Sequence, residues 1–129
     1  MKLHTSQNAS IPALENLPCA AGTEYKIGMG LVVSAGSAAK VGATATPEYI
    51  CMSEKKGVSG EYVQAIRVLK GETYEARLSE AGSALKIGNK VTIDADGIRV
   101  TATTASGVAQ ITGFMTEEQA AGDAVLVKF

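Results

Sequence analysis

The chain has 129 residues, of which 46% are apolar and 19% charged, and its 12 basic and 13 acidic residues leave a net charge of −1. This composition fits one globular domain with a buried core and argues against disorder. It excludes two classes of protein: without a basic run we expect no nucleic-acid binding, and without 18 consecutive apolar residues we expect no membrane span. Residues 1–20 also lack the continuous apolar core of a secretory signal.

Residues 1–22 are expected to form an extended arm ahead of a β domain over residues 23–129. Pro12 and Pro18 remove backbone donors and oppose a long helix in this segment. The arm carries four apolar residues, which are the candidate partner-binding residues: Leu3, Ile11, Leu14 and Leu17. They could be buried against another protein or, alternatively, across the chain's own domain. Removing the arm through Leu17 is expected to leave the β domain folded.

From Tyr25 onward, short β-like runs are separated by glycines. The expected strands outside the hairpin described next cover residues 29–34, 48–53, 61–69, 73–78, 110–115 and 124–129. In the fourth of these runs, Tyr74, Ala76 and Leu78 alternate with polar residues, which indicates one buried face. The expected fold class is all-β (mainly β): a small barrel or rolled sheet of about seven to nine short strands.

The strongest local signal is the pair Asp96-Gly97, which predicts a β-hairpin with a two-residue type I′ turn. The register that follows places four apolar residues on one buried face: Val91, Ile93, Val100 and Ala102. On the opposite face Asp94 then lies beside Arg99, a favourable cross-strand charge pair.

Two further patterns leave alternatives open. Residues 35–42 match residues 81–88 at six of eight positions, so they mark either equivalent corners of a barrel or convergence on the same corner chemistry. Residues 115–121 are the best candidate helix, capped by Thr116 and ended by Gly122, although a charged turn is the alternative.

The chain offers little chemistry. Its one histidine, His4, lies in the arm, where a catalytic group would be poorly positioned. Cys19 and Cys51 are too far apart in sequence for a close metal or redox motif, and we expect both to be reduced thiols. We therefore expect no catalytic residue, no metal ligand and no cofactor, and the protein is not expected to be an enzyme.

The stretch from Gly30 to Phe129 resembles the head decoration (cement) proteins of tailed bacteriophages and prophages. Four segments carry the resemblance: residues 30–33 with the corner at 37–42, residues 47–54, residues 88–93 with the following Asp-Gly turn, and residues 120–129. The stretch from Gly30 to Phe129 covers about three-quarters of the chain.

The resemblance implies a structural virion protein that is made in the bacterial host cytoplasm and located on the capsid exterior. Its partner would be the major capsid protein, and it would stabilise the expanded head as a homo-oligomer, with a trimer favoured. The alternatives are a small-molecule- or carbohydrate-binding β-barrel, which the shortage of aromatic residues disfavours, or another virion structural protein such as a head-fibre base.

Overall fold

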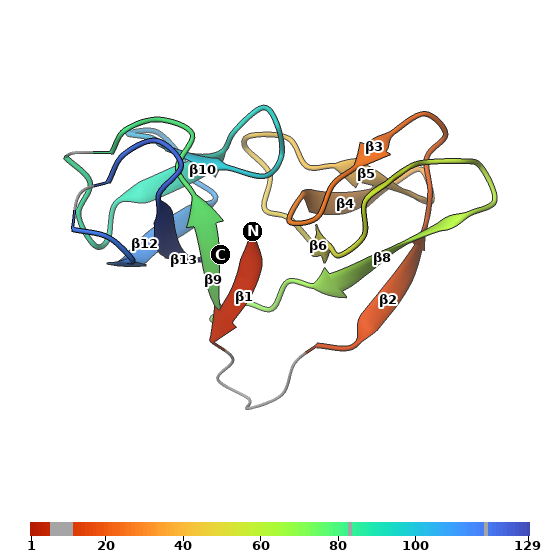
Figure 1. Cartoon of the computed structure of the whole chain (residues 1–129), viewed down its shortest axis with the longest axis horizontal. Coiled ribbons are helices and arrows are strands. Elements are labelled where there is room, and N and C mark those ends of the chain that lie inside the picture. Colours follow the sequence, from red (N-terminus) through yellow and green to blue (C-terminus); the bar gives the residue numbers. More distant parts are fainter. Residues whose placement is uncertain (6–11, 83, 118) are drawn as a thin grey trace.

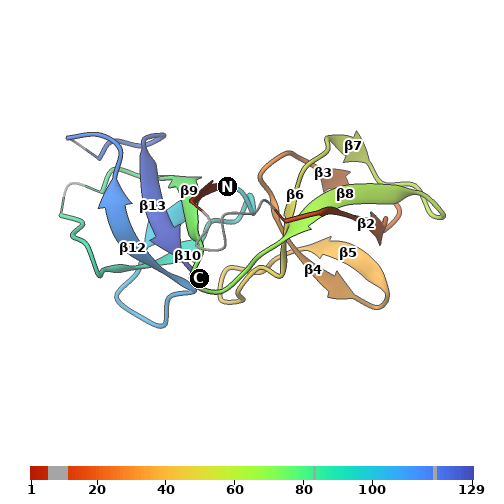
Figure 2. The same cartoon turned by 90° about the horizontal axis from the view of Figure 1, so that it is seen from below.

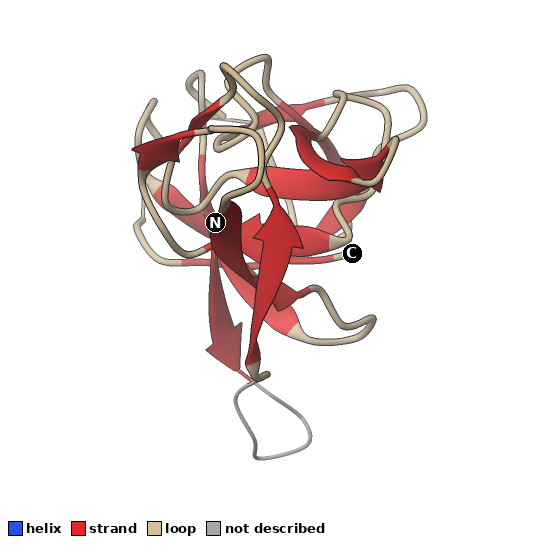
Figure 3. Cartoon of the chain, turned by 90° about the vertical axis from the view of Figure 1, so that its right-hand side faces the viewer, coloured by secondary structure: helices blue, strands red, loops and turns tan. Residues whose placement is uncertain are grey.

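The computed structural model describes residues 1–5, 12–82, 84–117 and 119–129, and these residues form strands, turns and loops but no helix (Figure 3). The all-β expectation is confirmed. The described residues form thirteen strands, so the expected number was too low. Most of the strands that were missed have only two to five residues, and their sequences lack a clear alternation of apolar and polar side chains.

The strands form three antiparallel sheets. One has the order β1 (Lys2–Thr5), β9 (Thr73–Arg77), β13 (Ala124–Lys128), β12 (Ala109–Phe114), β10 (Lys90–Ile93) and β11 (Val100–Ala102). The second has the order β2 (Leu14–Pro18), β8 (Tyr62–Arg67), β6 (Tyr49–Cys51), β4 (Gly30–Ser34) and β5 (Ser37–Lys40). A small ribbon pairs β3 (Glu24–Tyr25) with β7 (Lys55–Lys56).

The five-stranded sheet, and the five strands from β9 to β11 of the six-stranded sheet, each curl until their first and last strands meet at one isolated parallel bridge. In the sheet from β2 to β5, the bridge joins Cys19 to Ala38; we call this sheet the first roll. In the strands from β9 to β11, the bridge joins Leu78 to Val100; we call these five strands the second roll. The molecule thus consists of two rolled sheets side by side rather than one barrel (Figures 1 and 2).

The inward face of each roll is apolar. Eight buried residues face inward in the first roll: Leu17, Cys19, Leu31, Ala38, Tyr49, Cys51, Val63 and Ala65. The corresponding residues of the second roll are also buried: Ala76, Leu78, Val91, Val100, Ala109, Ile111, Val125 and Val127. Burial of these alternating side chains from water is the main force that holds each sheet in its curled form.

The two rolls share one topology. If their strands are taken in chain order, both have the spatial order first, fifth, fourth, second, third. Four backbone hydrogen bonds of the first roll recur 60 positions later: Gly28–Cys51 as Gly88–Ile111, Met29–Lys26 as Asn89–Lys86, Glu48–Leu31 as Val108–Val91, and Cys51–Met29 as Ile111–Asn89. The chain is therefore built from two copies of one structural unit.

This repeat excludes one of the two interpretations of the octets, that they mark equivalent corners. Residues 35–42 form the β4–β5 corner, whereas residues 81–88 lie between β9 and β10, so the two octets do not occupy equivalent corners. The structural equivalent of 81–88 is 21–28, which keeps Ala, Gly, Lys, Ile and Gly at the same five positions. The octet match at 35–42 is therefore not a sign of equivalent position, and the weaker match at 21–28 marks the repeat.

Polar contacts and the N-terminus join the two rolls. Gly30 N donates to Gly97 O at 2.7 Å, and Lys40 Nζ donates to Ala95 O at 2.6 Å. The buried Met1 amine donates to Gly28 O at 2.7 Å, and desolvation lowers the pKa of this amine to about 6. Backbone groups of the two rolls therefore approach each other closely at this junction. This close approach favours glycine at Gly28, Gly30 and Gly97.

The predicted hairpin register is confirmed. Val91 pairs with Ala102 and Ile93 with Val100, and Asp94 N donates to Arg99 O at 2.8 Å. Three of the four apolar side chains are buried, but Ala102 is exposed because it ends its strand. On the other face, the Asp94 carboxylate lies 3.6 Å from the Arg99 guanidinium, as expected.

The predicted turn type is wrong at this hairpin. A type I′ turn needs positive φ at both central residues, and only Gly97 of the pair has it. The Asp96 carboxylate instead accepts hydrogen bonds from the backbone N–H groups of Ile98 and Arg99. Both central residues have positive φ in the β4–β5 hairpin, where Ala35 is at +50° and Gly36 at +79°.

The candidate helix at residues 115–121 does not form in the part of this segment that the structure describes. It belongs to the connection between β12 and β13, where the Asp123 carboxylate accepts hydrogen bonds from Ala120 N at 2.9 Å and from Thr116 Oγ1 at 3.4 Å. Thr116 therefore takes part in a turn rather than capping a helix. Side-chain hydrogen bonds of this kind compete with the backbone hydrogen bonds of a helix.

Candidate interaction surface

The structure places three of the four candidate partner-binding residues, and Ile11 lies outside the described residues. Leu3 is partly buried in β1 against the second roll, and Leu17 is buried in β2 inside the first roll. Leu14, also in β2, is 56% exposed. Residues 2–5 and 14–18 thus lie in the sheets of this chain, and of the three placed residues Leu14 has the most surface left for a partner.

The described residues carry no cluster of three or more His, Cys, Asp or Glu side chains that could hold a metal ion. Within the same residues, no helix is long and apolar enough to span a membrane. Cys19 and Cys51 are free thiols buried in the first roll, and burial raises the pKa of Cys51, which disfavours its reactive thiolate.

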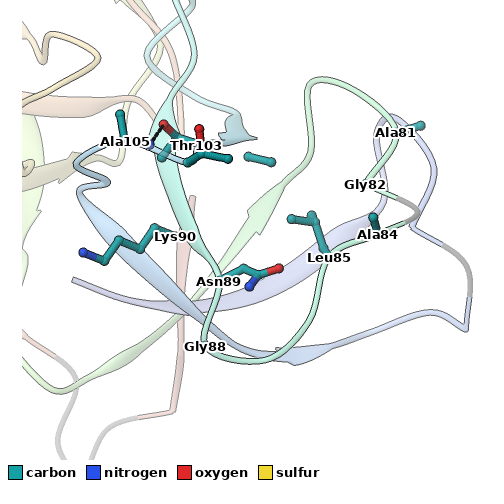
Figure 4. A pocket seen from close by; sticks show the side chains of 11 residues that line it. Ala81, Gly82, Ala84, Leu85, Gly88, Asn89, Lys90, Thr103 and Ala105 are labelled. Atoms are coloured by element: carbon teal, nitrogen blue, oxygen red, sulfur yellow. Dashed lines mark hydrogen bonds between the residues drawn. The ribbon is translucent and has the colours of Figure 1, made fainter.

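An open hollow lies at the end of the second roll (Figure 4). Its lining comes from the loops on either side of β10 and β11: Ala81, Gly82, Ala84, Leu85, Gly88, Asn89, Lys90, Ala102, Thr103, Thr104 and Ala105. These side chains include no carboxylate, thiol or imidazole, and the Thr103 hydroxyl accepts a hydrogen bond from Ala105 N at 3.2 Å. Among the lining residues that the structure describes, Lys90 has the one charged side chain.

The outward side of β2 and β8 is a more distinctive surface. Residues directly opposite each other in the ladder face the same side, so Pro18 accompanies Tyr62 and Asn16 accompanies Gln64. With Leu14 and Met52 they form what we call the uncharged face, and all six residues are exposed: Leu14, Asn16, Pro18, Met52, Tyr62 and Gln64. Tyr62 is 59% exposed, an unusual position for so large an apolar ring.

The second roll provides an internal comparison for this face. The positions of β9 that correspond to Asn16 and Pro18 are Glu75 and Arg77, which are both charged. Both surfaces come from the same structural unit, yet only the one on the second roll is charged. The lack of charge on the first roll is therefore not imposed by the fold, and uncharged surface with an aromatic residue is typical of protein interfaces.

A polar cluster supports β2 from the opposite side of the sheet. Arg67 donates from Nε and Nη2 to the Glu15 carboxylate at 3.2 and 3.0 Å, and its guanidinium lies 4.7 Å from the Tyr49 ring centre. Arg67 Nη2 also donates to the Tyr49 hydroxyl at 2.6 Å. These contacts tie β2 to β8 and β6, so the uncharged face is supported by an ordered sheet.

Most of this surface was not predicted from the sequence. Tyr62 lies within the expected strand at residues 61–69, but its exposed position was not predicted. The available signal was the alternation at residues 62–65, where Tyr62 and Gln64 share a side opposite to Val63 and Ala65. Which of those sides is buried depends on the curl of the sheet, and this is not encoded in the local pattern.

Comparison with known proteins adds no functional assignment. No family model matches the chain, and a search of curated proteins finds no matching relative.

Proposed function

We propose that this protein is a structural virion protein that binds the outer surface of a phage capsid and stabilises the expanded head. The observation that carries the proposal is the uncharged face of the first roll, including Leu14, Met52 and Tyr62, beside an equivalent surface that is charged. Such a surface suits contact with another protein, since charged residues are depleted at interface cores and aromatic residues are enriched there.

The proposed partner is the major capsid protein, and the proposed location is the capsid exterior. A homo-oligomer, with a trimer favoured, would present several copies of the uncharged face to the lattice at once. Modest contacts would then add through avidity. The proposal assigns the protein no enzymatic role, and it requires neither a cofactor nor a nucleic acid.

The direct experiment is co-sedimentation of the purified protein with empty capsids of the phage whose genome encodes it. We expect saturable binding to expanded capsids, weaker binding to unexpanded precursors, and a higher disruption temperature for the decorated shells. Light scattering of the free protein measures the oligomeric state in parallel. Absence of binding to expanded capsids would refute the proposal.

A carbohydrate- or small-molecule-binding protein is the alternative from a different class. It would need a concave site with aromatic platforms and converging polar groups. The hollow in Figure 4 is lined mainly by small side chains and has no aromatic residue. A melting-temperature screen against sugars would favour this alternative if one sugar raised the melting temperature while capsids did not bind.

A further inference from the structure

The junction between the two rolls consists of a hairpin tip and a surface that receives it, which we call the seat. The tip is the turn of the β10–β11 hairpin at residues 95–98. The seat belongs to the first roll, where Gly30 N donates to Gly97 O at 2.7 Å. Lys40 Nζ donates to Ala95 O at 2.6 Å. Gly97 is buried in this contact, so the tip lies close against the seat.

The repeat identifies the corresponding seat on the second roll. Three residues of the first seat have counterparts that follow from the matching hydrogen bonds and ladders: Met29 with Asn89, Gly30 with Lys90, and Lys40 with Ala102. All three counterparts line the hollow (Figure 4). Thr104 at its rim corresponds to Gly42, where an added Cβ would meet no atom within 4 Å, so we place Thr104 outside the seat.

The two seats differ in what covers them. Met29 and Gly30 are buried in the first seat, and an added Cβ on Gly97 of the tip would lie 3.3 Å from Met29 Cγ. In the second seat, Asn89 and Lys90 are exposed. The hollow is therefore the equivalent of a surface that the same structural unit covers with a hairpin tip elsewhere in the chain.

The β4–β5 hairpin offers a tip of the same kind. Its turn at Ala35 and Gly36 matches Ala95 and Gly97 of the seated tip, and φ is +79° at Gly36 and +75° at Gly97. Residues 33–36 are exposed. Figure 2 shows this hairpin extending away from the second roll, so within one chain it does not reach the hollow.

We infer that the hollow of the second roll is a seat for the β4–β5 tip of a second copy of this chain. The inference rests on the homo-oligomer of the proposed function and specifies the two surfaces that form it. Because these surfaces differ, each copy would offer a tip to one neighbour and a seat to the other, and copies would join head to tail. Lys90 would donate to a backbone carbonyl of the tip, as Lys40 does to Ala95 O in the first seat.

The chemistry of the hollow suits such a turn. Its described lining has no aromatic ring and is formed largely by alanine, glycine and threonine. Small side chains let a turn approach with its backbone, as Gly97 approaches Gly30 in the first seat. The turn at Ala35 and Gly36 has the small side chains that this approach requires.

The first test is a pair of matched substitutions at glycines with positive φ. Gly36 has φ of +79° and Gly60, in the turn before β8, has +86°, and an added Cβ at either would meet no atom within 4 Å of the free chain. Gly36→Lys brings bulk and a positive charge to the seat that holds Lys90, whereas Gly60→Lys has the same backbone cost outside the proposed contact. By sedimentation equilibrium, Gly36→Lys should raise the dissociation constant of self-association at least about tenfold, and Gly60→Lys less than about threefold.

The second test distinguishes a tip-to-seat contact from a contact between like surfaces. Ala102→Trp fills the seat and leaves the tip unchanged. Neither Ala102→Trp nor Gly36→Lys should associate alone. An equimolar mixture should form a dimer and nothing larger, because one variant keeps a working tip and the other a working seat.

Melting curves of all variants must accompany these data. Should one fail to fold, amide hydrogen exchange of the unmodified protein replaces it, and residues 34–37 and 88–90 should exchange more slowly in the associated protein than after dilution. An unmodified protein that stays monomeric, equal association by Gly36→Lys and Gly60→Lys, a mixture without dimer, or unchanged exchange would each overturn the inference. A monomer that still binds capsids would leave the capsid-binding proposal standing, whereas an associated protein that does not bind capsids would overturn that proposal alone.

Discussion

Two glycines occupy equivalent positions in the two rolls, but only one of them is also needed for close packing. Gly28 and Gly88 precede β4 and β10 with φ of +85° and +93°. A Cβ at Gly28 would lie 2.6 Å from Met1 N, whereas one at Gly88 would meet no atom within 4 Å. The first glycine therefore permits the N-terminus to enter the junction between the rolls, and the second serves only its own turn.

We expect Gly88→Ala to cost about 1–2 kcal/mol of unfolding free energy from the positive φ alone. Gly28→Ala should cost roughly 1–3 kcal/mol more, because the added methyl group displaces the buried Met1 amine. Urea denaturation of the two variants under identical conditions measures the difference. Equal losses would show that the contact with Met1 does not contribute to stability.

Ala35 is the one described residue other than glycine that has a positive φ, +50°. Asparagine tolerates this conformation better and is favoured before glycine in type I′ turns. Ala35→Asn should therefore stabilise the protein by about 0.5–1 kcal/mol. The matched control is Ala95→Asn in the equivalent hairpin, which should change stability by less than about 0.5 kcal/mol. A loss of stability at position 35 would contradict the turn assignment.

At the scale of elements, β2 has an inward and an outward leucine with different roles. Leu17 is 7% exposed inside the first roll, and Leu14 is 56% exposed on the uncharged face. We expect Leu17→Ala to lower the unfolding free energy by about 2–4 kcal/mol and Leu14→Ala by less than about 0.5 kcal/mol. Thermal melts of the two variants check this, and similar losses would show that β2 is packed differently.

The same placement changes the expectation for a truncation that starts at Pro18. Such a chain lacks β1, β2 and the buried side chains of Met1 and Leu17, so its melting temperature should fall sharply. The β domain is thus expected to need residues 1–17, contrary to what the sequence suggested. Point substitutions on the exposed side of β2 are better tests of partner binding than the truncation.

The strands that were predicted correctly are those in which the order of apolar and polar side chains shows which face is buried. Residues 73–78 alternate cleanly, and the hairpin register follows from apolar pairs on one face with Asp94 and Arg99 on the other. Strands β1 and β2 were missed as sheet members because their burial depends on neighbours distant in the chain: Leu3 packs against the second roll and Leu17 inside the first. A short local pattern does not contain that information.

At the scale of the whole molecule, the repeat explains why two units of about 60 residues form one stable chain. A single unit of this size buries a small core. Here Ile50 and Ile66 on the outward side of the first roll are buried in the same apolar cluster as the interior of the second roll. The first roll therefore uses part of its outward side for the internal junction and leaves the uncharged face for a partner.

The measurement that tests the central claim most directly is capsid binding by two variants that gain the same negative charge. Tyr62→Glu places the charge on the uncharged face, and Thr104→Glu places it on an exposed loop of the second roll. Co-sedimentation titrations with expanded capsids should show that Tyr62→Glu weakens binding by about 2 kcal/mol, roughly thirtyfold, while Thr104→Glu binds like the unmodified protein. Equal binding by both variants, or a larger loss for Thr104→Glu, would contradict the assignment of the uncharged face as the capsid-binding surface.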